Sequence, residues 1–332
     1  MKILASLFSL CLVSAACIFF SGPQFPLRPV GSPVSLLAAN SVDIVKFLQS
    51  EESIVPHLKP ELAKKIIWSE LKTREKTPYS LVYLHGFSAS RGEISPVMEN
   101  VASSIQANLF FTRFKAHGLD NGEAFATLVA QDMIDDAREA LTVGRRIGQK
   151  VILVGTSTGA SLALHLAFEN IHQNDIAALV LISPNFGVPD WRGKYISGPA
   201  GPWLARLLLG PYHSFKPENE LHASLWTSHY RSESVAAVMD LVNYVNGIDL
   251  SRLQIPVFVL YTDKDQVVRT DLILKKFLEI GSNHKQILKV EASRNHVLAG
   301  EAVSPQATAV TIEAIKSFIK NLSIQQESAE YR

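Results

Sequence analysis

A serine in a glycine-flanked pentapeptide is the residue of this chain best placed to do chemistry. The pentapeptide at 155–159 reads Gly-Thr-Ser-Thr-Gly, follows the apolar run 151–154 and precedes the helix-prone stretch 160–169. A turn tight enough to join a buried strand directly to a helix forces its serine to a positive φ and requires small neighbours two residues away. Gly155 and Gly159 meet that requirement. The pattern predicts that Ser157 is a nucleophile; the alternative is an ordinary turn whose serine faces solvent.

A serine hydroxyl is a weak nucleophile at neutral pH, so it needs a base that takes its proton. Among the ten histidines, His296 follows the last predicted strand and precedes the closing helix, which places it at the carboxyl edge of the sheet, level with Ser157. His117, in a glycine-containing turn after a strand, is the alternative, although that turn is more typical of a structural loop. His165 is expected to face a helix or solvent. His85 begins the loop after the predicted strand 81–84, and the other six belong to a predicted insertion (His213, His222, His229) or to peripheral segments (His57, His172, His284).

The imidazole in turn needs a carboxylate that orients it and stabilises its charged form. Asp263, Asp265 and Asp271 follow the predicted strand 256–261. Asp265 is far enough beyond the strand to reach over the sheet edge, and two valines behind it pack the loop down. We therefore predict that Asp265 is the acid, with Asp263 as the alternative. Asp271 is expected in the first turn of the next helix, where a carboxylate suits the helix dipole.

Attack on a carbonyl also needs hydrogen-bond donors that stabilise the oxyanion. The backbone N–H of Thr158 points inward at the start of its helix. A second donor is expected from the loop 85–88, which reads His-Gly-Phe-Ser and follows the predicted strand 81–84. Gly86 lets the backbone approach, and the N–H of Phe87 is the expected donor. Such donors lower a barrier by about 3–4 kcal/mol each.

The elements that must position these residues alternate between strand and helix. Short continuous apolar strands that alternate with helices predict an α/β fold with a mostly parallel, doubly wound sheet covered on both faces. A surface helix is also expected over 58–71, before the alternation begins. The expected strands are 81–84, 109–111, 151–154, 177–182, 256–261 and 287–290, and the main helices are 94–105, 124–146 and 304–322.

Residues 185–246 interrupt this alternation. The segment contains no convincing strand and several aromatic residues, and an insertion at this point of the sheet would lie over the carboxyl ends of the strands, where open α/β sheets bind ligands. We expect a helical cap that shapes an apolar pocket; alternatively, the aromatic residues form only the cap's own core. They are Phe186, Trp191, Trp203, Tyr212, Phe215, Trp226 and Tyr230.

Composition narrows the classes of partner. The formal net charge is +1, and no cluster of Lys and Arg accompanies exposed aromatics, so no nucleic acid partner is expected. The two cysteines, Cys11 and Cys17, lie near the amino terminus, which excludes thiolate catalysis and a cysteine zinc site in the body of the chain. No His-x-x-x-His or similar ligand cluster is present. Neither a metal nor a cofactor is expected.

The first twenty residues predict export or anchoring. Lys2 precedes an uncharged apolar stretch over 3–20, and Ser14-Ala15-Ala16 offers a cleavage site for a signal peptide. The same stretch could span a bilayer as an uncleaved anchor, or Cys17 could carry a lipid. All three readings place the body of the chain outside the cytoplasm, as a secreted, periplasmic or membrane-anchored protein. Residues 21–55 are expected to be a linker.

The ordered set His85-Gly86-Phe87, Gly155-x-Ser157-x-Gly159, Asp265 and His296 resembles the α/β-hydrolase superfamily. Within it, the chain is most similar to the capped branch of carboxylesterases, monoacylglycerol lipases and lysophospholipases. The resemblance covers roughly residues 79–322 and implies an α/β-hydrolase domain over 56–325 with the cap at 185–246. The turn 114–118 stands where these relatives often have Gly-His-Gly. Two departures are the threonine at 262, where a glycine is common, and the threonines on either side of the serine.

The resemblance and the residues together imply a metal-independent serine ester hydrolase. Ser157 would form an acyl-enzyme, His296 would transfer the proton, and Asp265 would hold His296. The apolar cap and the amino-terminal segment suggest a lipid-like ester or one of short to medium acyl length. A thioesterase, an amidase or an acyltransferase would use the same residues. A non-catalytic binding protein that keeps the fold is the alternative from another class.

Overall fold

A seven-stranded, mostly parallel sheet forms the centre of the protein. The computed structural model describes residues 43–170 and 174–330, with side chains to residue 322. The strand order is β1-β3-β2-β4-β5-β8-β9; only β1 runs antiparallel to its neighbour. The predicted fold class is therefore confirmed. The strands are β1 (Lys65–Ile67), β2 (Thr77–Leu84), β3 (Asn108–Phe111), β4 (Gly148–Thr156), β5 (Ile176–Ile182), β8 (Val257–Tyr261) and β9 (Lys285–Lys289).

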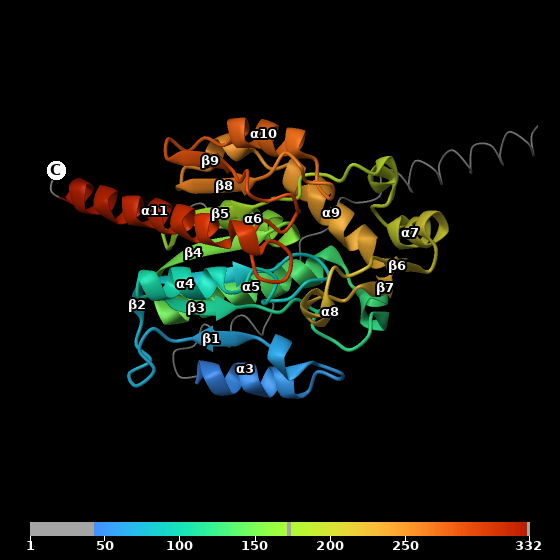
Figure 1. Cartoon of the computed structure of the whole chain (residues 1–332), viewed down its shortest axis with the longest axis horizontal. Coiled ribbons are helices and arrows are strands. Elements are labelled where there is room, and N and C mark those ends of the chain that lie inside the picture. Colours follow the sequence, from blue (N-terminus) through green and yellow to red (C-terminus); the bar gives the residue numbers. More distant parts are fainter. Residues whose placement is uncertain (1–42, 171–173, 331–332) are drawn as a thin grey trace, which may run out of the picture.

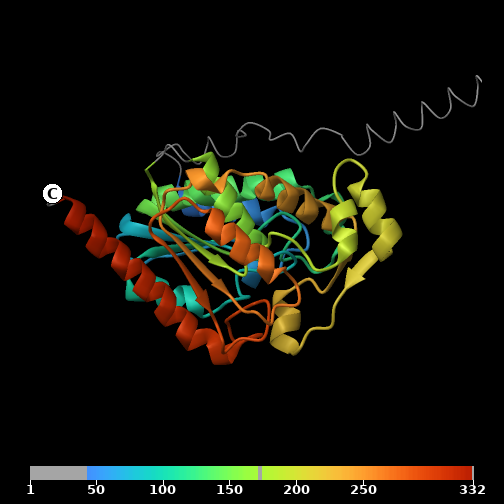
Figure 2. The same cartoon turned by 90° about the horizontal axis from the view of Figure 1, so that it is seen from above.

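Helices cover both faces of the sheet, and each face has its own apolar core. Because successive side chains of a strand point to opposite faces, Val82 and Leu84 of β2 join one core while Leu81 and Tyr83 join the other. Figures 1 and 2 show α4 and α11 together on one side of the sheet. The first core packs under α5 (Ala130–Ile147), α6 (Thr158–Glu169) and α10 (Thr270–Glu279), and the second under α4 (Val97–Ser104) and α11 (Pro305–Glu330).

The elements of the cap are grouped at one end of the sheet (Figure 1). Most of it is helical, as expected, but it also contains the antiparallel strands β6 and β7, which the sequence did not predict. Each has only three residues, too few to show an alternating pattern. The cap elements are a 3-10 turn η3 (Trp191–Tyr195), α7 (Gly201–Leu209), β6 (Tyr212–Ser214), α8 (Glu220–Leu225), β7 (His229–Arg231) and α9 (Ser234–Asn246).

The prediction of a surface helix over 58–71 is wrong. This segment forms a short 3-10 turn, η1 (Pro60–Leu62), followed by β1. Ile66 lies opposite Phe110 in the ladder with β3, so edge pairing with the sheet overrides the helical spacing of the apolar residues. The helix expected over 124–146 is divided into a 3-10 turn, η2 (Glu123–Thr127), and α5, because Val129 between them is extended.

Part of the segment expected to be a linker is the helix α3 (Ile44–Ser53). Asp43 caps it, since its carboxylate accepts hydrogen bonds from the N–H groups of Val45 and Lys46. Ile44 and Leu48 are buried in the first core. The expected signal peptide, anchor and lipidation site lie outside the described residues. In the part of the chain that the structure describes, no helix is both long enough and apolar enough to cross a membrane.

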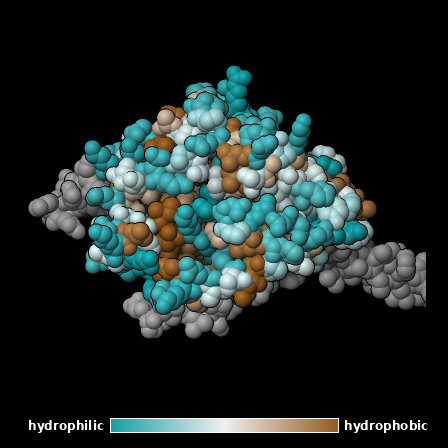
Figure 3. All heavy atoms as spheres, turned by 60° about the horizontal axis from the view of Figure 1, so that its bottom comes forward, coloured by the Kyte–Doolittle hydropathy of each residue, from teal (hydrophilic) through white to brown (hydrophobic). Residues whose placement is uncertain are grey.

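The protein surface is mostly hydrophilic on the face shown in Figure 3, and its apolar side chains gather in separate patches. Large exposed apolar side chains are frequent on the cap, where Trp191, Trp203 and Leu207 are each more than half exposed. The aromatic residues of the cap therefore differ in role: Phe186, Trp226 and Tyr230 are buried, whereas the two tryptophans at 191 and 203 face solvent.

Candidate active site

Ser157 stands on a strained turn between β4 and α6. Its φ and ψ are 55° and −117°, a conformation that a non-glycine residue adopts only when its surroundings enforce it. Its N–H donates to the carbonyl of Ile182 on β5, at 2.9 Å. A Cβ at position 159 would lie 2.0 Å from the carbonyl oxygen of Leu84, and one at 155 would lie 2.4 Å from the carbonyl group of Gly159. Glycine at both positions is what allows the turn.

His296 and Asp265 form a hydrogen-bonded pair across two loops. Nδ1 of His296 lies 2.7 Å from Oδ2 of Asp265. The other carboxylate oxygen accepts the N–H groups of Val267 and Val268, at 2.8 and 3.0 Å, so the loop itself orients the acid. Burial alone would raise the pKa of Asp265, but the hydrogen bond and charge of His296, with the two backbone donors, bring that pKa below its ordinary value. Asp265 is thus held as a carboxylate that fixes the imidazole.

The alternative acid, Asp263, points elsewhere. Its carboxylate forms an ion pair with Lys289 at 3.0 Å, and the side chain is half exposed. Asp271 pairs with Arg269 in the first turn of α10, as the sequence suggested. Thr262, which follows β8, has a structural partner: its hydroxyl donates to the carbonyl of Ser293, at 2.9 Å. This bond ties the acid loop to the loop that carries His296.

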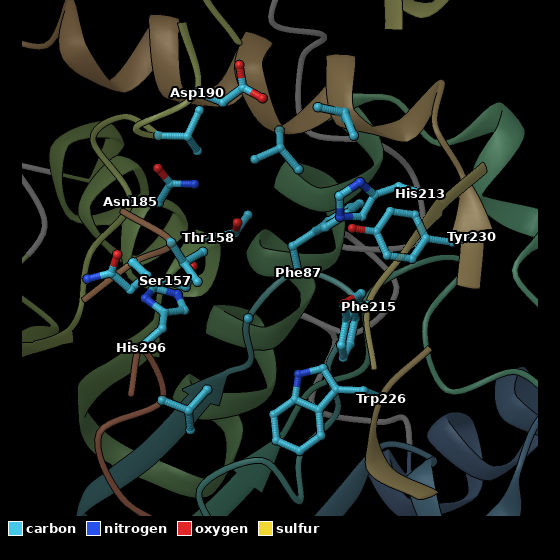
Figure 4. A pocket seen from close by; sticks show the side chains of 18 of the residues that line it. Phe87, Ser157, Thr158, Asn185, Asp190, His213, Phe215, Trp226, Tyr230 and His296 are labelled. Carbon is cyan, nitrogen blue, oxygen red and sulfur yellow. The ribbon is translucent and has the colours of Figure 1, made fainter. Parts of the chain in front are cut away.

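A second backbone tie brings His296 beside Ser157. The hydroxyl of Ser183, the residue after β5, donates to the carbonyl of His296 at 2.8 Å, while the preceding carbonyl, of Ile182, holds the N–H of Ser157. Figure 4 shows both side chains at the same wall of a pocket that both of them line. Nε2 of His296 is buried and has no hydrogen-bond partner in the described structure. In free enzymes the bond from nucleophile to base is often open and closes with substrate.

Two backbone N–H groups in the same pocket are free to bind an oxyanion. The N–H of Gly86 donates to Glu93 at 2.6 Å, and that of Ser88 donates to Nε2 of His117 at 2.9 Å. Between them, the N–H of Phe87 has no acceptor among residues 43–170 and 174–330, nor has the N–H of Thr158 in the first turn of α6. Both residues line the pocket. The structure thus brings together all five predicted site residues.

The loop 85–88, here called the oxyanion loop, is also held by a contact from the cap. The carbonyl of Ser88 accepts the N–H of Thr227, which lies between α8 and β7, at 2.8 Å. Three contacts therefore hold this loop. Glu93 accepts the N–H of Gly86, His117 accepts the N–H of Ser88, and Thr227 of the cap donates to the carbonyl of Ser88. These contacts fix its conformation before any substrate binds.

The competing histidines serve the structure. His117 accepts from Ser88 at Nε2, so Nδ1 carries the proton and donates to the carbonyl of Lys115 at 2.8 Å. Burial and the nearby His85 hold the pKa of His117 well below its usual range. His165 is buried against the ring of Tyr244 on α9 and does not face solvent; burial lowers its pKa to about 4. Neither histidine can act on Ser157.

The pocket has a volume of about 740 Å³ and lies between the strand ends and the cap. One wall is apolar and comes largely from the cap core around α7 and α9, including Val188, Leu209 and Met239. Phe215, Trp226 and Tyr230, which also belong to the cap, lie across the pocket from Ser157 and His296 (Figure 4). The cap therefore shapes a largely apolar pocket above the reactive groups, as expected. No group of three or more His, Cys, Asp or Glu side chains placed to hold a metal occurs in the described part of the chain.

Sequence reasoning missed Glu93, whose carboxyl accepts the N–H of Gly86, and Tyr83, whose hydroxyl is bonded to Glu93. Tyr83 lay inside an apolar strand, and Glu93 lay in a polar loop before a predicted helix, so each matched its surroundings. One feature of the sequence could have indicated a buried carboxyl here: the acidic Glu93 directly precedes the apolar Ile94, a few residues after the expected donor Phe87. That signal is too common to identify a buried carboxyl.

Comparison with known proteins agrees with this architecture. One similar solved structure is a lipolytic enzyme from a study of the metagenome-derived LipS and LipT, with a TM-score of 0.65 and 15% identity over 79% of this chain and 99% of that one. A second is a soluble variant of monoglyceride lipase from Saccharomyces cerevisiae, with a TM-score of 0.59 and 13% identity over 78% of this chain and 91% of that one. A third is the monoacylglycerol lipase of Paleococcus ferrophilus, with a TM-score of 0.55 and 15% identity over 77% of this chain and 99% of that one. At these identities the likeness shows the fold alone. A model of the alpha/beta hydrolase family matches residues 81–309. The chain therefore belongs to the alpha/beta hydrolase family.

Proposed function

We propose that the protein is a serine hydrolase that cleaves carboxylic esters through an acyl-enzyme on Ser157. His296 takes the proton of the Ser157 hydroxyl as the oxygen attacks the ester carbonyl, and the N–H groups of Phe87 and Thr158 bind the oxyanion. The protonated imidazole, held by Asp265, then gives its proton to the departing alcohol. His296 then takes a proton from water, which attacks the acyl carbon. The bond from that carbon to Ser157 Oγ breaks, the imidazolium returns the proton to Oγ, and the carboxylic acid leaves.

One observation carries this proposal: a buried carboxylate orients an imidazole whose other nitrogen is unpartnered beside a strained serine. Asp265 holds Nδ1 of His296 at 2.7 Å, Nε2 has no partner in the described residues, and Ser157 keeps a positive φ at the wall of the same pocket. Strain of this kind persists where function requires it. A binding protein that merely kept the fold would not need this polar constellation at the base of an apolar pocket.

The pocket favours an ester with an apolar acyl group. The cavity of about 740 Å³ falls in the range of ligand pockets, and its cap-side wall offers aliphatic side chains such as Val238 and Met239. We propose that the acyl chain, of short to medium length or lipid-like, lies against this wall. Thioesters, amides and acyl transfer would use the same groups, so the acyl donor has to be determined by experiment.

Hydrolysis of nitrophenyl esters by Ser157→Ala and the wild type tests the reaction. We expect the variant to lose about 10³-fold or more in kcat and to lose labelling by a fluorophosphonate, with Ser224→Ala, at an exposed serine of α8, as the matched control. Wild-type-like turnover by Ser157→Ala would end the proposal. Esters, thioesters and amides of one acyl group, followed by esters of graded length, identify the donor and the acyl preference.

We also propose that residues 3–20 export the protein or anchor it to a membrane. The support is the sequence of that segment alone, an uncharged apolar stretch after Lys2. Mass spectrometry of the mature amino terminus, after cell fractionation, distinguishes a cut near Ala16, a lipid on Cys17 and an intact anchor. Recovery of the intact chain in the cytoplasmic fraction alone would refute export and anchoring together.

A further inference from the structure

A buried carboxyl group is hydrogen-bonded to the oxyanion loop and also lines the pocket. Glu93, between β2 and α4, is 1% exposed, and its Oε1 accepts two hydrogen bonds. The N–H of Gly86 donates at 2.6 Å and the hydroxyl of Tyr83 at 2.7 Å. A buried carboxyl is costly to keep unless hydrogen bonds compensate it, so an apolar residue would be the simpler choice for a core position.

The hydroxyl of Tyr83 extends this contact to the nucleophile turn. It lies 2.8 Å from Oγ1 of Thr156, at the end of β4. A hydroxyl both donates and accepts, so Tyr83 bonds to Glu93 and to Thr156 at once, and either hydroxyl can be the donor between Tyr83 and Thr156. The result is a continuous chain of hydrogen bonds from Gly86 through Glu93 and Tyr83 to Thr156. All four residues are buried.

The two ends of this chain adjoin the two proposed oxyanion donors. Gly86 precedes Phe87 in one loop, and Thr156 begins the turn that leads through Ser157 to Thr158 in the other. The N–H groups of Phe87 and Thr158 belong to different segments, so their spacing depends on what joins those segments. Oxyanion stabilisation is sensitive to that spacing, because the donors must lie about 2.7–3.1 Å from the developing charge.

Close packing makes the contact specific. A Cβ at position 86 would lie 2.9 Å from Oε2 of Glu93 and 3.6 Å from Cβ of Ser157, so the carboxyl fills the space behind the glycine, close to the nucleophile. Burial raises the pKa of Glu93 to about 8, against the hydrogen bonds from Tyr83 and Gly86, which lower it. A neutral carboxyl at this place adds no fixed negative charge behind the oxyanion.

We propose that Glu93 is a positioning residue for the oxyanion hole, which acts through Gly86 on one side and through Tyr83 and Thr156 on the other to fix the distance between the two donors. Its role lies in stabilising the oxyanion and not in binding the ground state. This inference rests on the proposed function, since it assigns a role within ester hydrolysis at Ser157.

Kinetics of Glu93→Met, Glu93→Gln and Tyr83→Phe test the inference. Methionine keeps the volume but accepts no hydrogen bond from Gly86, so we expect kcat to fall about 10²-fold, as when an oxyanion donor is lost, with KM within about threefold of wild type. Glutamine keeps an acceptor for both donors and should restore kcat to within about fivefold. Tyr83→Phe should lower kcat about tenfold. The losses of Glu93→Met and Tyr83→Phe should not multiply in the double variant, because both residues act in one chain of hydrogen bonds.

Several results would overturn the inference. A Glu93→Met enzyme with wild-type kcat would do so, as would a Glu93→Gln enzyme as impaired as Glu93→Met, since the acceptor would then not be what matters. Circular dichroism establishes which variants fold; if Glu93→Met does not, Tyr83→Phe decides, and a kcat within twofold of wild type refutes the proposal. A wild-type protein inactive on every ester would instead refute the proposed function, and this inference with it.

Discussion

A buried ion pair between the amino-terminal helix and the sheet makes a quantitative prediction. Glu52 on α3 and Arg113 after β3 are 8% and 7% exposed. The carboxylate accepts from Nε and Nη2 of Arg113 at 2.9 and 2.8 Å and from the N–H of Lys64 at 3.0 Å. The third guanidinium nitrogen donates to the carbonyl of His117 at 3.2 Å. The pair therefore joins α3 to the loop that holds the oxyanion loop.

Glu52→Gln should destabilise the fold strongly. Burial alone would raise the pKa of Glu52, but Arg113 and Lys64 bring that pKa below its ordinary value, so the group is charged in the folded protein. Removing one charge of a buried pair leaves the other uncompensated and costs about 3–5 kcal/mol. For a domain of this size, 1 kcal/mol corresponds to about 2–4 °C. We expect the melting temperature to fall by about 6–20 °C.

Thermal unfolding followed by circular dichroism measures this shift, and Asp271→Asn is the matched control. Asp271 and Arg269 form an exposed pair, with side chains 63% and 49% exposed, and such pairs contribute about 1 kcal/mol or less. The control should melt within about 2–4 °C of wild type. If Glu52→Gln also melts there, the reasoning is refuted, and α3 does not depend on this pair for its attachment.

Three further predictions concern the site. Asp265→Asn should lower kcat by about 10⁴-fold, because the amide no longer holds His296 in the required tautomer; Asp263→Asn should stay within twofold in the same ester assay, and equal losses would contradict the assignment. Gly159→Ala should prevent recovery of folded protein, judged by gel filtration, since its Cβ would lie 2.0 Å from the carbonyl oxygen of Leu84; a well-folded variant would show that the turn can open. Glu93 binds a proton in the folded state up to about pH 8, whereas in the unfolded chain it ionises near its ordinary pKa of 4.5. Wild-type stability should therefore decline relative to Glu93→Gln between about pH 5 and 8 and not beyond; a constant difference in melting temperature from pH 5 to 9 would refute this.

The central strands could be read from the sequence because their burial is nearly complete. Every residue of β5 is buried, so its apolar run carries the signal without help from its neighbours. Once the order of strands is fixed, topology places residues that follow β4, β8 and β9 at one edge of the sheet. Ser157, Asp265 and His296 could be proposed together for that reason.

Other features depend on contacts that no local pattern encodes. β1 exists because Ile66 pairs with Phe110, far along the chain, and its own sequence favours a helix. The short strands β6 and β7 define each other by pairing, as Tyr212 does with Arg231. Burial of Glu93 follows from the close approach of Gly86, which only the folded loop reveals.

The main-chain bond between Thr227 and Ser88 joins the cap directly to the loop that carries the proposed oxyanion donor Phe87. A cap joined to its domain only at hinges can vary freely, whereas here a cap residue is hydrogen-bonded to the backbone of the loop that would stabilise the transition state. We expect insertions near α8 to shift this loop and to lower the rate with every substrate. Helix α7, whose larger contacts are with η3, β6 and α9, takes no part in this bond, so we expect substitutions there to change selectivity with less effect on rate.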